Sequence, residues 1–132
     1  MKIENIITSS KHARGFYSPA KKIDLGDSYL IFVSGIQCPK DENNNILSED
    51  INEQTTLVFE EIGKILKNAG ASFDDVVKAV IYLTDMNNFS VVSTIRQDYF
   101  KNSKPVSTMV EVNGFTEKKS QIEIEVTAII KK

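Results

Sequence analysis

The sequence predicts an α+β domain in which two helices pack on one face of a mixed β-sheet. Two segments, 51–69 and 89–101, carry apolar residues at the spacing of an amphipathic helix. Shorter segments alternate apolar and polar residues or are rich in β-branched side chains, which is typical of strands: 3–8, 28–35, 76–84, 106–112 and 121–130. Two helices can cover only one face of such a sheet. We therefore expect the other face to be partly exposed in a monomer and buried in an oligomer.

The amino-terminal third is predicted to hold two strands separated by an irregular segment. Residues 3–8 are predicted to form a short apolar strand, whereas residues 10–22 are polar and contain glycine and proline, which indicates a loop or an irregular edge segment. The segment 28–35, with the sequence SYLIFVSG, is typical of a buried strand. Residues 39–50 include three consecutive asparagines among charges, and we expect them to form an exposed loop.

The first helix has recognisable signals at both ends. Asp50 can accept a hydrogen bond at its amino terminus, and Gly70 follows the last apolar residue as a carboxyl-terminal cap. Between them, one apolar stripe at helical spacing is expected to face the sheet: Ile51, Val58, Ile62, Ile65, Leu66 and Ala69.

The carboxyl-terminal half is predicted to form a strand, a second helix and two further strands. The second helix ends before Pro105, which cannot continue it. Its apolar stripe is Phe89, Val92, Ile95 and Tyr99. The sheet face that the helices leave open is expected to be mixed, with Tyr82, Met109 and Ile129 among the carboxylates Glu111, Glu123 and Glu125.

Composition excludes several classes of protein. The chain has 132 residues, which is enough for a single domain over 1–132, and its formal net charge of -2 argues against nucleic-acid binding. No run approaches the roughly 18 apolar residues of a membrane span, and the first ten residues lack the apolar core of a signal peptide. The single cysteine, Cys38, cannot form an internal disulfide. We therefore expect a cytoplasmic protein that binds neither membranes nor nucleic acids.

Few side chains carry obvious chemistry. The one histidine, His12, has no second histidine with which to hold a metal, so we expect no metal site. Glu123 and Glu125 share one face of a strand, where paired carboxylates either divide acid and base roles or simply face solvent. The only two arginines, Arg14 and Arg96, can each hold a small carboxylate through two hydrogen bonds or else point into solvent.

Five segments carry motifs that occur in this order in a known family. They are GFYSPA at 15–20, VSGIQCP at 33–39, NAGASFDDVVKAVIYLTDMNNF at 68–89, KPVSTMVEV at 104–112 and IEIEVTAI at 122–129. Together they resemble the RidA/YjgF family, also called the L-PSP endoribonuclease family, over nearly the whole chain.

The resemblance implies a chorismate mutase-like α+β fold, a homotrimer with pockets between subunits, and no metal or organic cofactor. Members of that family hydrolyse reactive enamine and imine acids, such as 2-aminoacrylate, to 2-keto acids and ammonia. It also implies that Tyr17, Ser34, Gly35 and Glu123 line the pocket, with Glu123 positioning the attacking water.

One position departs from the family pattern. The signature Pro-Ala-Arg-Ser-x-Val-Glu-Val corresponds to residues 105–112, so Ser107 stands where the resemblance places the arginine that binds the substrate carboxylate. Met109 stands where cysteine or threonine is common, and Ser93 stands where many members have asparagine. A serine hydroxyl cannot supply the charged, two-pronged donor of an arginine.

Three functions are therefore open. The first is a divergent imine or enamine deaminase in which Arg14 or Arg96 binds the substrate carboxylate, and Arg14 is preferred because it is close in sequence to Tyr17. The second is a non-catalytic trimer that binds a small carboxylate-bearing metabolite in the same pocket. The third is a ribonuclease, against which the net charge of -2 argues.

Overall fold

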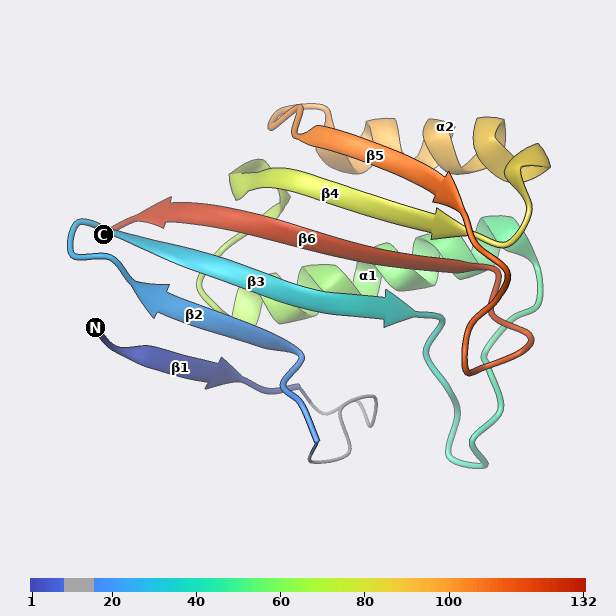
Figure 1. The fold of residues 1–132 in the computed structure, drawn as a ribbon, viewed down its shortest axis with the longest axis horizontal. Helices are drawn as coiled ribbons and strands as arrows, with labels where there is room; N and C mark the ends of the chain where they lie inside the picture. Colours follow the sequence, from blue (N-terminus) through green and yellow to red (C-terminus); the bar gives the residue numbers. More distant parts are fainter. Residues whose placement is uncertain (9–15) are drawn as a thin grey trace.

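The computed structural model describes residues 1–8 and 16–132, which form one six-stranded sheet with two helices on one face (Figure 1). The strands are ordered β1-β2-β3-β6-β4-β5 across the sheet. This arrangement confirms the predicted α+β class. In chain order the elements are β1 Ile3–Ile6, β2 Ala20–Asp24, β3 Ser28–Gln37, α1 Ile51–Asn68, η1 Phe73–Asp75, β4 Val76–Leu83, η2 Met86–Asn88, α2 Phe89–Phe100, β5 Val106–Glu111 and β6 Ile122–Lys131.

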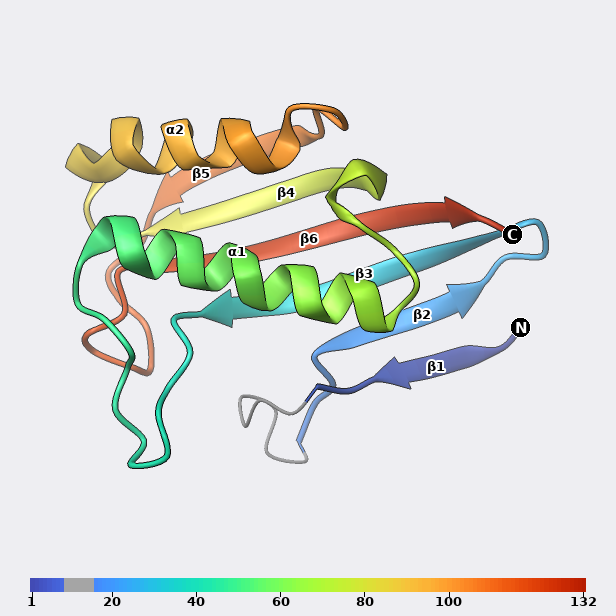
Figure 2. The ribbon, with the colours of Figure 1, turned by 180° about the vertical axis from the view of Figure 1, so that it is seen from behind.

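The sheet is mixed because one of its strand pairs is parallel. β4 and β5 run parallel, and every other neighbouring pair is antiparallel. A parallel pair needs a crossover connection, and α2 provides it. As a result α2 lies along the β5 edge of the sheet, as both views show (Figures 1 and 2).

The core lies between the sheet and the two helices. α1 packs across β3 and β6 and beside α2 (Figure 2). Its predicted apolar stripe is confirmed, since Val58, Ile62, Ile65, Leu66 and Ala69 are buried and Ile51 is half-buried against the core. Phe59 joins the two helices, because its ring stacks on Tyr99 of α2 with the centroids 4.5 Å apart.

Both predicted ends of α1 are confirmed. The Asp50 side chain accepts a hydrogen bond from the Glu53 backbone N–H at 3.0 Å, which satisfies one of the donors that a helix start leaves unpaired. Gly70 follows the helix with a φ of +84°, a left-handed conformation that glycine adopts without steric cost.

One strand was missed by the sequence analysis. Residues 20–22 were predicted as the end of a loop or irregular edge segment, but Ala20–Asp24 forms β2 and pairs with both β1 and β3. The prediction was wrong because Lys21 and Lys22 give the segment a polar character, whereas neighbouring strands supply the hydrogen bonds and bury Ala20.

The predicted position of Met109 on the open face was also wrong. β5 pairs with β4, and Met109 is aligned with the buried Ile81, so it packs against the core on the helix-covered face. Glu111 shares that face and accepts a hydrogen bond from the Met86 backbone N–H at 2.8 Å. Parallel pairing of β5 with β4, which alternation within β5 does not reveal, decides this placement.

The predicted burial of Phe89 was also wrong. It was assigned to the buried stripe of the second helix, yet 45% of its surface is exposed. The rest of the predicted stripe is confirmed, since Val92 is buried and Ile95 and Tyr99 pack against the core. Phe89, as the first residue of α2, lies on the helix face that also carries Ser93 and Arg96. No helix in the described part of the chain is long and apolar enough to cross a membrane.

Candidate functional site

Glu123 is held in a fixed position against the backbone of the neighbouring strand. Gln37 donates a hydrogen bond from Nε2 to Glu123 Oε1 at 2.9 Å. The other oxygen lies over Gly35, where an added Cβ would be only 2.6 Å from Glu123 Oε2. Glycine at this position therefore makes room for the carboxylate.

The segment that carries Tyr17 is tied to the same part of β3. Ser34 donates a hydrogen bond from its hydroxyl to the Ser18 carbonyl at 2.9 Å, and its backbone N–H donates to the Pro19 carbonyl at 2.8 Å. Tyr17 therefore begins the stretch that runs beside Ser34 and Gly35. We call the group Tyr17, Ser34, Gly35, Gln37 and Glu123 the carboxylate cluster.

The second carboxylate on this face, Glu125, is engaged differently. Tyr82 donates a hydrogen bond from its hydroxyl to Glu125. This hydrogen bond, helped by desolvation, raises the pKa of Tyr82 to about 12, so the hydroxyl stays protonated at neutral pH. Among the described residues, Glu123 Oε2 has no such donor. Glu125 Oε2 likewise has no donor among these residues, and what distinguishes Glu123 is that its Oε2 lies over Gly35.

A guanidinium group lies beside Ser107. Arg96 donates from Nη1 to the Ser107 hydroxyl at 3.1 Å and from Nη2 to the Ser93 hydroxyl at 2.9 Å. Its Cζ is 5.9 Å from the centroid of the Phe89 ring. Because Phe89, Ser93 and Arg96 are spaced four and three residues apart, they share one face of α2. We call Phe89, Ser93, Arg96 and Ser107 the guanidinium cluster.

The charge of Arg96 is not neutralised within residues 1–8 and 16–132. The ion pairs formed by these residues involve lysines, and none includes Arg96. Its two hydrogen-bond partners are neutral hydroxyls, so they orient the guanidinium without cancelling its charge. The remaining N–H donors of the half-buried side chain can bind an anion.

The two clusters face opposite sides of the sheet. Ser107 is aligned with Ala79, which is buried on the helix-covered face. Glu123 is aligned with Tyr82 on β4, and Tyr82 is three residues beyond Ala79, so it points the other way. A single copy of the chain therefore cannot bring Arg96 and Glu123 to the same small molecule.

The structure places the predicted site residues in two groups. Gly35 and Glu123 are in contact, and Tyr17 directly precedes Ser18, whose carbonyl accepts the hydrogen bond from Ser34. Ser107 joins the guanidinium cluster, and Met109 follows it on the same strand face. Arg14, which the sequence favoured as the anchor, and His12 lie outside the described residues.

Arg96 was a predicted anchor, but its partners Ser93 and Ser107 were not predicted. The i, i+3 spacing of Ser93 and Arg96 on one helix is a sequence signal for the contact between those two residues only. The contact with Ser107 could not be predicted from spacing, because it depends on the parallel pairing of β4 and β5, which brings α2 alongside β5.

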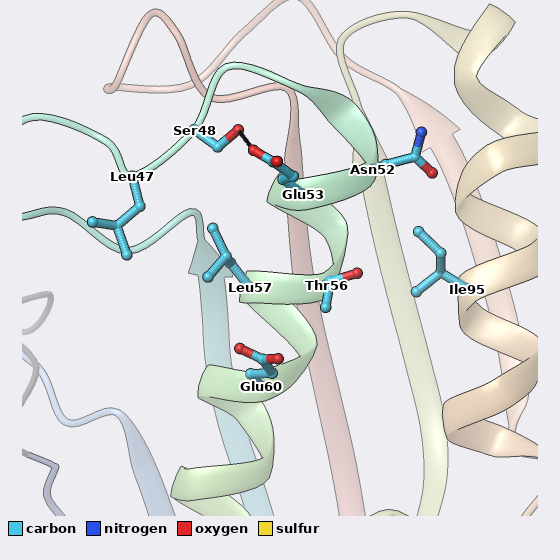
Figure 3. A pocket seen from close by; sticks show the side chains of 8 residues that line it. All are labelled: Leu47, Ser48, Asn52, Glu53, Thr56, Leu57, Glu60 and Ile95. Carbon is cyan, nitrogen blue, oxygen red and sulfur yellow. Dashed lines mark hydrogen bonds between the residues drawn. The ribbon is translucent and has the colours of Figure 1, made fainter.

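One pocket that the described residues form lies away from both clusters. It is an open hollow of about 580 Å³ between the loop before α1, the outer face of α1 and Ile95 of α2 (Figure 3). Leu47 and Leu57 give it an apolar lining, and Glu53 and Glu60 add carboxylates. None of the residues predicted for the site lines it. No group of three or more metal-binding side chains occurs among the described residues.

Comparison with known proteins identifies related chains over most of the sequence. The family model described as Endoribonuclease L-PSP matches residues 8–130. A RutC family protein of Pyrococcus abyssi is 45% identical over 100 residues, covering 75% of each chain. The human 2-iminobutanoate/2-iminopropanoate deaminase is 33% identical over 129 residues, covering 96% of this chain and 90% of the human one.

Solved structures agree with the sequence matches. The crystal structure of a Rid family protein of unknown function from Yersinia pestis has a TM-score of 0.86 and 32% identity, covering 98% of this chain and all of the other. The fold that places the two clusters is thus the fold of these relatives. The chain belongs to the RidA/YjgF family.

Proposed function

We propose that this protein is a Rid-type hydrolase that converts 2-imino acids, or their enamine tautomers, to 2-keto acids and ammonia. The observation that carries the proposal is the hydrogen bond from Arg96 to Ser107. The resemblance to the family places the carboxylate-binding arginine at position 107, and here a guanidinium from α2 lies at that position. The deaminases among the relatives support the same reaction class.

Arg96 has the chemistry that a carboxylate anchor needs. The guanidinium is always charged, and its planar donors match the two oxygens of a carboxylate. Ser93 and Ser107 hold it in one orientation, so less conformational freedom is lost when substrate binds. A charge-assisted contact of this kind contributes about 1.5–3 kcal/mol, or roughly ten- to a hundredfold in binding.

Glu123 is the proposed general base. Its Oε2 takes a proton from water while the water oxygen bonds to the imine carbon. The imine nitrogen takes that proton from Glu123, which gives a carbinolamine. Glu123 then moves the hydroxyl proton of the carbinolamine to the amino group, so the C–N bond breaks, ammonia leaves and the carbon becomes the keto carbonyl. The hydrogen bond from Gln37 fixes Glu123 Oε1, so the carboxylate keeps its orientation toward the water during the step.

The site is proposed to form between two copies of the chain. Because the two clusters face opposite sides of the sheet, the Arg96 of one copy must meet the Glu123 of another. The homotrimer that the resemblance implies provides such interfaces. Phe32 and Ile129, which are 47% and 43% exposed on the open face, offer apolar surface for the contact.

The test measures hydrolysis of 2-iminobutanoate generated in situ by a pyridoxal-phosphate dehydratase. We expect the wild type to accelerate keto-acid release and Arg96→Ala to lose at least about tenfold in kcat/KM. Lys101→Ala is the matched control, since it removes a positive charge just beyond the same helix, and we expect it to retain activity. Full activity in Arg96→Ala would overturn Arg96 as the anchor.

The alternative is a metabolite-binding trimer without catalysis. It was motivated by the serine at position 107, and the guanidinium beside that serine removes its main support. A wild type that binds a 2-keto acid in a calorimeter but leaves 2-iminobutanoate to hydrolyse at the spontaneous rate would favour it over the deaminase.

A further inference from the structure

We infer that the site selects 2-imino acids with large apolar side chains, aromatic ones above all, over the small imine derived from alanine. This inference rests on the proposed function and concerns the specificity of the same site. It follows from where the Arg96 guanidinium lies and from the apolar side chains next to it.

The Arg96 guanidinium, the proposed carboxylate anchor, lies close to strand β5. Arg96 Nη1 is 3.1 Å from the Ser107 hydroxyl, so the guanidinium lies about level with the γ position of residue 107. An arginine on β5 itself would carry its guanidinium well beyond that position. Because Ser107 is short and exposed, the space that such a side chain would fill is left for substrate.

Apolar surface continues from the anchor in one direction. Met109 is two residues after Ser107 on the same face of β5 and packs partly against the core. The Phe89 ring adjoins the Arg96 guanidinium and is 45% exposed. The hydrogen bond from the Met86 N–H to Glu111 shows that the start of α2 lies near the end of β5. Phe89 and Met109 therefore lie on the same side of the anchor.

This order matches the layout of an amino-acid-derived imine. The carboxylate would bind Arg96 at the Ser107 end, and the side chain would extend over Met109 and Phe89. The thioether of Met109 adapts to differently shaped apolar groups. An aromatic substrate side chain could pack against the Phe89 ring, which is now partly in water. Each methylene buried there favours the larger substrate by about fourfold.

The test compares two imines made by the same L-amino acid oxidase, one from phenylalanine and one from alanine. The measured quantity is the ratio of their kcat/KM values, corrected for spontaneous hydrolysis. We expect a ratio above one for the wild type. Phe89→Ala should lower the ratio about tenfold, because a weaker Arg96 anchor affects both imines alike and cancels in the ratio, whereas the lost aromatic contact affects only the phenylalanine-derived imine. Leu25→Ala is the control, since Leu25 is 50% exposed and lies in the turn between β2 and β3.

A second variant moves the anchor itself. In Arg96→Ser combined with Ser107→Arg, the guanidinium comes from β5 and fills the space beside it, so the ratio should fall while the alanine-derived imine is still hydrolysed. A wild-type ratio at or below one, or a ratio that Phe89→Ala leaves unchanged, would overturn the specificity inference and leave the proposed function standing. A wild type that hydrolyses neither imine would overturn the proposed function, and this inference with it.

Discussion

The Arg96 guanidinium, which α2 carries, donates a hydrogen bond to the Ser107 hydroxyl of β5 at 3.1 Å. The two residues are eleven positions apart in the chain, and the parallel pairing of β4 and β5 brings them together. A positive charge therefore lies beside Ser107, which has no charge of its own. This relationship makes the serine at position 107 compatible with binding of a carboxylate.

The orientation of Arg96 should matter as well as its charge. Arg96→Lys keeps the positive charge, but an ammonium group cannot offer a planar pair of donors to a carboxylate. We expect kcat/KM for 2-iminobutanoate to fall about tenfold, and Arg96→Ala to fall further. Steady-state kinetics check this order. Equal activity in Arg96→Lys and wild type would show that charge alone suffices.

The glycine at position 35 should be needed for the position of the Glu123 carboxylate rather than for the stability of the fold. In Gly35→Ala the new methyl would lie 2.6 Å from Glu123 Oε2 and 2.7 Å from its Cδ, so the carboxylate must move. A displacement of this size typically costs about a hundredfold in rate. We expect that loss in kcat with little change in the melting temperature.

Gly114→Ala is the matched control, because a Cβ at that position meets nothing within 4 Å. It should have wild-type activity. If Gly35→Ala were equally active, Glu123 would not be the base at the position described.

Tyr82 should make stability depend on pH in the alkaline range. Its pKa is raised from 10.0 in the unfolded chain to about 12 by the hydrogen bond to Glu125, so between these values the folded state binds the proton that the unfolded state has lost. The stabilisation is complete below pH 10 and is lost as the pH rises toward 12.

Tyr82→Phe removes this titration. Urea unfolding between neutral pH and the alkaline range should therefore show a smaller decrease in unfolding free energy for the variant than for the wild type. Parallel pH profiles for the two proteins would contradict the assignment.

The aromatic group between the helices should dominate core stability. Phe59 is fully buried and contacts the rings of Phe73, Tyr99 and Phe100. Phe59→Ala should lower the unfolding free energy by about 3–5 kcal/mol. Phe89→Ala removes an equal side chain that is 45% exposed, and chemical denaturation should show a much smaller loss for it. Similar losses in both variants would contradict this description of the core.

Much of the fold could be predicted from local patterns. The sequence gives clear ends for α1, because Asp50 and Gly70 act within a turn of the helix. It could not reveal β2, whose lysines are tolerated because β1 and β3 pair with that strand. The placement of Met109 failed for a related reason, since it depends on which strand β5 joins.

The candidate site was predicted in part. The residues around Gly35 and Glu123 could be found because the motifs that carry them are local. The contact of Arg96 with Ser107 depends on the packing of α2 beside β5, so no spacing in the sequence predicts it. The single domain, the trimer, the cytoplasmic location and the independence from cofactors stay predictions.

The central claim is that Arg96 and Glu123 from different copies complete one site, and subunit mixing tests it most directly. Arg96→Ala and Glu123→Gln should each be nearly inactive. When equal amounts are unfolded together and refolded, about a quarter of the inter-subunit sites should contain both native residues, because each partner is intact in half of the copies. Recovery of about a quarter of the wild-type activity is the predicted result. A mixture that assembles but stays as inactive as its components would contradict the claim.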